Sequence, residues 1–205
     1  MKIIAHRAND GIHRENSLEA ILNSLNKSYI DGVEFDIRLT KDNKFILNHD
    51  PFYLGHLISS ASSKTLKKIG LNILEDVLSK LNTDKIILIE IKNDYKKYSK
   101  ISKYLNKILK KYQLNIYLCS FDYNLINYIN KKYKYKCGII IGKIINQKHI
   151  NNNLHFNSIS YKYKGLIPKK ETFYWTINNP KNIKKGNIIT DKPKTIYESI
   201  NQKNL

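Results

Sequence analysis

The 205-residue sequence has few of the features that mark several protein classes. Its only two cysteines, Cys119 and Cys137, lie in apolar runs, so we expect buried thiols rather than a disulfide framework. No apolar run approaches the roughly 18 residues that a bilayer span needs. The N-terminus lacks the apolar core of a signal peptide, because His6 and Arg7 interrupt it. We therefore expect a cytoplasmic protein.

Proline and glycine are also scarce, with four and eight copies, and no repeat or Gly/Ser-rich or Pro-rich linker divides the chain. Hydrophobic residues make up 41%, which is enough for a core and excludes a disordered or collagen-like chain. A chain of 205 residues suits one domain. We therefore expect a single domain over residues 1–205.

Acidic residues are few, since 17 Asp and Glu stand against 36 Lys and Arg, for a formal charge of +19. Such a charge suggests a polyanionic partner. However, only Arg7, Arg14 and Arg38 are arginines, and nucleic-acid readers favour arginine for bidentate contacts. Lysine is abundant together with isoleucine and asparagine, whose codons are also AT-rich, so base-composition drift accounts for it. The composition argues against a nucleic-acid partner and leaves the oligomeric state open.

Aliphatic runs alternate with amphipathic segments along the chain. The predicted helices, with apolar residues three and four positions apart, are Ser17–Tyr29, Leu74–Leu81, Tyr98–Tyr112 and Tyr123–Tyr133. The predicted strands are Lys2–His6, Val33–Ile37, Phe45–Asn48, Lys85–Ile91, Ile116–Ser120, Gly138–Ile141, Ser158–Tyr161, Phe173–Ile177 and Asn187–Thr190. This alternation predicts an α/β protein with a parallel sheet. Eight units would close a TIM (β/α)8 barrel, for which about 200 residues is the lower limit.

Nine predicted strands are one more than this barrel holds. The link Arg38–Lys44 before Phe45–Asn48 is too short for a crossover helix, so one segment is a hairpin strand or a false prediction. The helical link between Gly142 and Asn157 is the weakest, because Asn151–Asn153 breaks its pattern. We expect a small barrel with a short or absent insertion after the third strand.

Charged residues two positions apart, among them three carboxylates, occur at the ends of two predicted strands. Glu34 and Asp36 share one face of a strand, because successive side chains alternate, and Glu90 and Lys92 repeat the arrangement. Inward carboxylates without a partner are costly, and a divalent cation removes that cost. Oxygen ligands favour Mg²⁺ or Ca²⁺ over zinc. The pattern predicts a metal site with an anion-binding lysine; the alternative is a solvated edge strand.

Two histidines also stand at strand ends, His6 followed by Arg7, and His49 in FILNHDP. Near a metal, one imidazole could deprotonate an attacking hydroxyl or water while the other protonates a leaving alkoxide. Arg7 and Lys92 would offset the growing charge on phosphorus. These are the groups that phosphodiester cleavage needs, although a strand-end histidine is also commonly structural.

The blocks that carry these residues resemble the glycerophosphodiester phosphodiesterase family. They are IAHRANDGIHRENSLEA, DGVEFDIRLTKDNKFILNHD, IEIK, SFD, WTIN and IITDKP, in this order from Ile3 to Pro193. The resemblance implies a TIM barrel with a divalent metal, Mg²⁺ or Ca²⁺. It also implies hydrolysis of glycerophosphodiesters, such as glycerophosphocholine, to glycerol 3-phosphate and an alcohol. In the family mechanism a neighbouring glycerol hydroxyl attacks first, and water then opens the cyclic phosphate.

The resemblance implies a role for each matched residue. It implies general acid and base roles for His6 and His49, and metal ligation by Glu34, Asp36 and Glu90. The implied substrate-binding residues are Arg7, Lys92, Asn16 and Trp175, the last as a wall of the glycerol pocket, and the supporting residues are Glu15 and Asn178.

The chain departs from the family pattern near the predicted site. Ala8 stands where the family has glycine, so we expect a reshaped first loop, and Arg14 replaces a proline. Only Pro51–Gly70 follows the HD motif before the next predicted helix, which predicts an open pocket mouth. One alternative activity is therefore lysophospholipase D-like or sphingomyelinase D-like cleavage of a larger phospholipid, with peripheral contact to a membrane. A second is non-catalytic polyanion binding through lysines.

Overall fold

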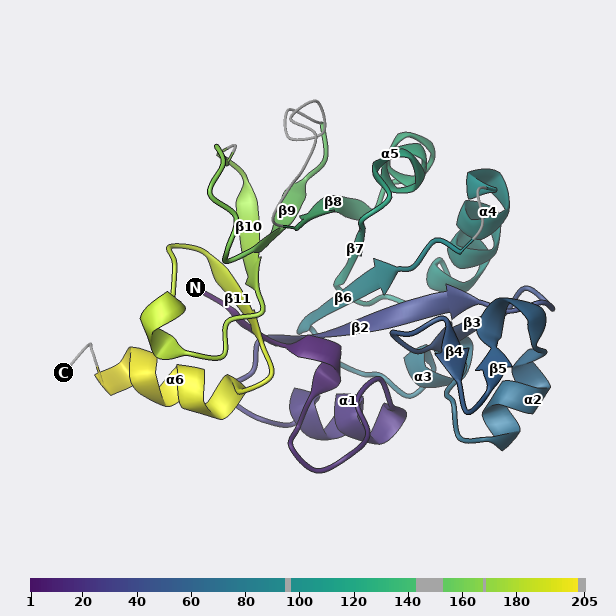
Figure 1. The fold of residues 1–205 in the computed structure, drawn as a ribbon, viewed down its shortest axis with the longest axis horizontal. Helices are drawn as coiled ribbons and strands as arrows, with labels where there is room; N and C mark the ends of the chain where they lie inside the picture. Colours follow the sequence, from purple (N-terminus) through teal and green to yellow (C-terminus); the bar gives the residue numbers. More distant parts are fainter. Residues whose placement is uncertain (95–96, 143–152, 168, 203–205) are drawn as a thin grey trace.

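Eight parallel strands form a closed barrel in the computed structural model, which describes residues 1–94, 97–142, 153–167 and 169–202 (Figure 1). Closure comes from β1, which pairs with β2 on one side and with β11 on the other. The predicted TIM barrel is therefore confirmed. Its strands are β1 (Ile3–Ala5), β2 (Gly32–Leu39), β6 (Ile86–Ile91), β7 (Ile116–Ser120), β8 (Lys136–Ile141), β9 (Phe156–Ser160), β10 (Glu171–Trp175) and β11 (Asn187–Thr190).

The ninth predicted strand, β3 (Phe45–Leu47), lies outside the barrel as the antiparallel hairpin partner of β2. The short link before it excludes a parallel crossover, as expected. The segment after it holds a second hairpin that the sequence analysis missed, formed by β4 (Phe52–Tyr53) and β5 (His56–Leu57). These strands have two residues each, too few to show an alternating pattern.

The helices lie around the outside of the barrel (Figure 1). The four predicted helices are confirmed with shorter bounds: α1 (Leu18–Leu25), α3 (Leu74–Leu78), α4 (Tyr98–Leu109) and α5 (Tyr123–Lys132). Two further helices were not predicted, α2 (Ser63–Lys68) and α6 (Pro193–Gln202), in which Leu66 and Ile196 are the large buried hydrophobic residues. Three 3₁₀ turns complete the described elements: η1 (His6–Ala8), η2 (Ile58–Ser60) and η4 (Pro180–Asn182).

Strand alternation divides the buried residues into two layers. Val33, Phe35 and Ile37 of β2 belong to the larger cluster between strands and helices, while Ile4 and Phe156 belong to the cluster that fills the barrel interior. Burying these side chains supplies the main stabilising free energy, at about 25 cal/mol per Å² of apolar surface. The inward positions of β2 instead carry the charged residues Glu34, Asp36 and Arg38. This strand therefore contributes polar groups to the barrel interior.

Cys119 and Cys137 are both free and buried, as predicted. No described helix has the length and apolar character that a membrane crossing requires. The weak link predicted between Gly142 and Asn157 lies largely outside the described residues, which omit 143–152.

Candidate active site

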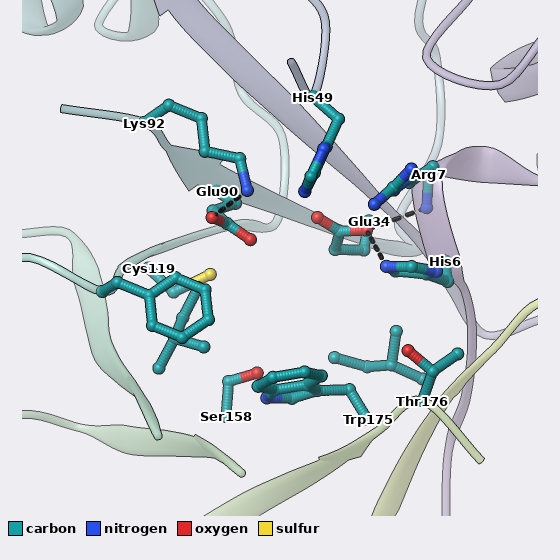
Figure 2. A pocket seen from close by; sticks show the side chains of 13 residues that line it. His6, Arg7, Glu34, His49, Glu90, Lys92, Cys119, Ser158, Trp175 and Thr176 are labelled. Carbon is teal, nitrogen blue, oxygen red and sulfur yellow. Dashed lines mark hydrogen bonds and ion pairs between the residues drawn. The ribbon is translucent and has the colours of Figure 1, made fainter. Parts of the chain in front are cut away.

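A cavity of about 180 Å³ lies where residues at and just beyond the carboxyl ends of several strands converge (Figure 2). One side is charged and the other is mainly apolar, with Trp175 facing the charged side. Parallel strands place their carboxyl ends at one end of a barrel, which is where such barrels hold their active sites. The predicted site residues that line it are His6, Arg7, Glu34, His49, Glu90, Lys92 and Trp175.

The three predicted metal ligands form a cluster. Glu34, Asp36 and Glu90 each offer a carboxylate oxygen, and these oxygens lie within 4.8 Å of one another. Burial, with the Asp36 charge second, raises the pKa of Glu34 to about 8. Burial and the same charge also raise the pKa of Glu90. This excess of negative charge fits a divalent cation, and the all-oxygen ligand set suits Mg²⁺ or Ca²⁺.

Lys92 and Asn16 hold Asp36 within the cluster. Lys92 Nζ lies 3.0 Å from Asp36 Oδ1 and also pairs with Glu90. Asn16 Nδ2 donates to Asp36 Oδ2 at 3.0 Å, and the amide of Asp36 donates to Asn16 Oδ1 at 2.9 Å. Burial would raise the pKa of Asp36, but Lys92 and Asn16 outweigh it and lower that pKa. Asn16 is thus buried behind a carboxylate rather than lining the cavity.

His6 lies between two carboxylates. Its Nδ1 is 2.6 Å from Asp191 Oδ1, and its Nε2 is 4.0 Å from Glu34 Oε2. Burial alone would lower the pKa of His6, but the Asp191 hydrogen bond and the Glu34 charge outweigh it and raise that pKa. Asp191 also accepts from Asn178 Nδ2 at 2.6 Å. Asp191 was not predicted as a site residue, although it is a carboxylate directly after a predicted strand, in IITDKP.

His49 approaches the same cluster from the segment after β3, and Figure 2 shows its ring directed toward Glu34 and Glu90. Its Nδ1 lies 2.8 Å from Asp50 Oδ1. The His49 side chain is 38% exposed, whereas that of His6 is 22% exposed. The two histidines therefore reach one cavity from different loops and with different access to solvent.

Arg7 combines a backbone and a side-chain contact with the acidic groups. Its amide donates to Glu34 Oε2 at 2.8 Å, and its Nη1 donates to Glu15 Oε1 at 2.9 Å. Its Nε is buried without a hydrogen-bond partner among the described residues and lies 3.8 Å from Asp36 Oδ2, so it faces the acidic cluster. Ala8 adopts a φ of 55°, so its methyl group does not keep the loop out of the left-handed region.

Aromatic side chains bound the other side of the cavity. Trp175 packs edge-on against Phe121, with ring centroids 5.8 Å apart. Its indole nitrogen is buried and has no hydrogen-bond partner in the part of the chain that the structure describes. Asn178, which we expected as a supporting residue, donates to Asp191 and accepts from the Thr190 hydroxyl. It supports the partner of His6 rather than the aromatic wall.

This arrangement agrees with a comparison to known families. The sequence profile of the glycerophosphoryl diester phosphodiesterase family matches residues 6–150, well over half of the chain. The chain belongs to this family. It is therefore a phosphodiesterase, and its matched region contains both histidines and all three clustered carboxylates.

Similar proteins cover nearly the whole chain. The glycerophosphodiester phosphodiesterase of Caldanaerobacter subterraneus subsp. tengcongensis is 24% identical, over 97% of both chains. The crystal structure of the Thermotoga maritima glycerophosphodiester phosphodiesterase has a TM-score of 0.77 at 23% identity, over 96% of both chains. An Oleispira antarctica phosphodiesterase, in complex with the product sn-glycerol-3-phosphate, has a TM-score of 0.85 at 16% identity, over 98% of this chain and 97% of that one. The last two likenesses establish the shared fold.

Proposed function

We propose that the protein hydrolyses glycerophosphodiesters to glycerol 3-phosphate and an alcohol, with a divalent cation bound by Glu34, Asp36 and Glu90. The observation that carries this proposal is that His6 and His49 both line the cavity that is also lined by Glu34 and Glu90 of this acidic cluster. The product named for the Oleispira antarctica relative supports the choice of substrate. We place this activity in the cytoplasm.

The two histidines share the proton transfers. A glycerol hydroxyl next to the phosphate attacks phosphorus, one imidazole takes its proton, and the other protonates the departing alkoxide. Water then opens the cyclic phosphate by the reverse transfers. Asp191 forms a hydrogen bond with Nδ1 of His6, so Nε2 is the ring nitrogen that exchanges a proton with the substrate in the cavity.

The charged side of the cavity binds the phosphate. Arg7 and Lys92 both line the cavity, and they supply two cations beside the acidic cluster. A bound Mg²⁺ or Ca²⁺ would stabilise the negative charge that develops on the phosphate oxygens. The carbon skeleton of the substrate packs against Trp175, the aromatic wall opposite these groups.

The test is glycerol 3-phosphate release from glycerophosphocholine and glycerophosphoethanolamine, in EDTA and with each cation restored. We expect release with Mg²⁺ or Ca²⁺ and none in EDTA. His6→Ala and His49→Ala should each lose at least about 100-fold in turnover. His56→Ala, an exposed histidine on the neighbouring hairpin, is the matched control. Near wild-type turnover in both site variants, or no release with any cation, would overturn the proposal.

A second candidate substrate class is a lysophospholipid, which carries an acyl chain. Phe52 and Leu54 on the β4–β5 hairpin are 57% and 71% exposed, and Ile12 in the loop after η1 is 76% exposed. The guanidinium of Arg14 lies 5.7 Å from the Tyr53 ring centroid, which brings these two loops together. Exposed apolar side chains next to the His49 segment could contact an acyl chain or the surface of a lipid aggregate.

Comparing soluble glycerophosphocholine with lysophosphatidylcholine separates these candidates. If the acyl chain is recognised, the double substitution Phe52→Ser/Leu54→Ser should reduce lysophosphatidylcholine hydrolysis at least about tenfold and leave glycerophosphocholine turnover unchanged. Leu22→Ser, which removes an exposed apolar side chain from α1, is the control. Equal turnover of both substrates by the wild type and the double variant would exclude acyl-chain recognition.

A further inference from the structure

Arg38 binds the backbone of the segment that carries His49. Its Nε and Nη2 both donate to the His49 carbonyl oxygen, at 2.9 and 2.6 Å. Its Nη1 pairs with the Asp94 carboxylate after β6. Arg38 is only 7% exposed, so these contacts are buried, and each of its three guanidinium nitrogens has a partner. A carbonyl that accepts two donors from one guanidinium is fixed in direction as well as in distance.

His49 depends on this backbone contact more than His6 does. The described partner of its ring is Asp50, whose side chain is 75% exposed. An exposed ion pair of this kind contributes little free energy, so it does little to fix the orientation of the His49 ring. His6, in contrast, bonds to an Asp191 that Asn178 also holds. The position of the His49 ring over the cavity is therefore determined mainly by where its main chain is held.

The residues of β2 connect this contact to the acidic cluster. Glu34, Asp36 and Arg38 occupy alternate positions of one strand, so they share its inward face. The amide of Asn48 donates to the Asp36 carbonyl oxygen at 3.1 Å, directly before His49. The strand β2 thus presents two of the carboxylates and also holds the segment that carries His49. It therefore sets the distance between His49 and these carboxylates.

We propose that Arg38 is a positioning residue for His49. It acts through the carbonyl of His49 and does not touch the substrate, and this role rests on the proposed function of His49. Lysine has one nitrogen and cannot reproduce two donor nitrogens that converge on one oxygen, so its charge alone should not substitute for the guanidinium. Because a misplacement of about 1 Å can cost about 100-fold in rate, loss of this contact should appear in kcat.

The experiment is a double-mutant cycle with glycerophosphocholine, measured at high enzyme concentration so that weak activities are quantified. Arg38→Met and Arg38→Lys should each lower kcat by about 10- to 100-fold. The KM and the dissociation constant of the activating cation, measured by calorimetry, should stay within about threefold of wild type. In the His49→Ala background, Arg38→Met should cause no further loss, because the group that it positions is absent. Lys111→Met, which removes a surface cation that pairs with Glu75, should keep full activity.

Two controls keep the outcomes distinct. If circular dichroism shows that Arg38→Met fails to fold, Asp94→Asn is the alternative variant. It weakens the contact of Arg38 Nη1 and keeps the two donors, Nε and Nη2, that bind the His49 carbonyl. It should lower kcat by about 2- to 10-fold in wild type and not at all in His49→Ala. Additive losses in the cycle, a changed cation affinity, or wild-type kcat in Arg38→Met would overturn the proposal. Full activity of His49→Ala alone would instead overturn the proposed function.

Discussion

Asp191 and His6 lie 185 positions apart in the sequence, yet Oδ1 of Asp191 is 2.6 Å from Nδ1 of His6. The register of the barrel explains this contact. Ala5 at the end of β1 pairs with Thr190 at the end of β11, so the residues that directly follow these strands are neighbours. Closure of the barrel between its first and last strands thus gives His6 its orienting carboxylate.

Asp191→Asn should reduce both activity and stability. We expect turnover to fall at least about tenfold, because the hydrogen bond that orients the His6 ring is weakened. The pKa of His6 is raised in the folded protein, so this interaction stabilises the fold below the unfolded pKa of about 6.5 and is lost as pH rises through the folded pKa. Thermal denaturation should show a deficit of about 1–2 kcal/mol near pH 5.5 that shrinks as the pH rises through the folded pKa of His6. A deficit that grows with pH would contradict this account.

Glu34→Gln should separate cation binding from stability. We expect calorimetry to show weaker binding of Mg²⁺ or Ca²⁺ and activity to fall at least about 100-fold. The folded pKa of Glu34 is about 8, well above that of an unfolded glutamate, so its ionisation disfavours the fold as pH rises toward 8. In EDTA at pH 8, Glu34→Gln should therefore unfold at a higher temperature than wild type. Glu75→Gln, which alters a surface glutamate paired with Lys111 and Lys44, should leave cation binding and activity unchanged.

Asp10→Asn should destabilise the loop between η1 and α1 at neutral pH. Burial would raise the pKa of Asp10, but hydrogen bonds from His13, Asn23 and the Ile12 amide outweigh it and hold that pKa well below its usual value. A lowered carboxyl pKa stabilises the fold above the unfolded value of about 3.9 and is lost as pH falls below it. We expect a deficit of about 1–2 kcal/mol at pH 7 by denaturant unfolding, narrowing below pH 4. A deficit that does not depend on pH would show that the charge contributes nothing.

Gly138→Ala should destabilise the barrel interior. A Cβ at this position would overlap the ring of Phe156, which fills the space that the glycine leaves. Overpacking of this kind costs about 1–3 kcal/mol. Gly142→Ala is the matched control four residues later, where the nearest described atom to a Cβ is 4.0 Å away on Phe121. Unfolding temperatures should fall for the first variant and stay near wild type for the second.

Local patterns predicted the parts of the site that lie on single strands. Alternation along β2 was enough to place Glu34 and Asp36 on one face, and the same rule brought Glu90 and Lys92 together on the neighbouring strand. The hairpin of β2 and β3 followed from the shortness of its link. The β4–β5 hairpin and α6 were missed, because short or weakly apolar segments leave little periodicity to detect.

The sequence by itself determined most of the strand and helix segments, the inward carboxylates and the histidines at strand ends, because side-chain alternation and helix periodicity are properties of neighbouring residues. Only the tertiary structure decided that Asp191 bonds to His6 and that Arg38 holds the His49 carbonyl. Those contacts depend on which strands close the barrel and in which register, and that choice minimises the free energy of the whole chain. The same fold leaves most lysines exposed on the surface, whereas Arg7 and Lys92 lie among carboxylates in the site.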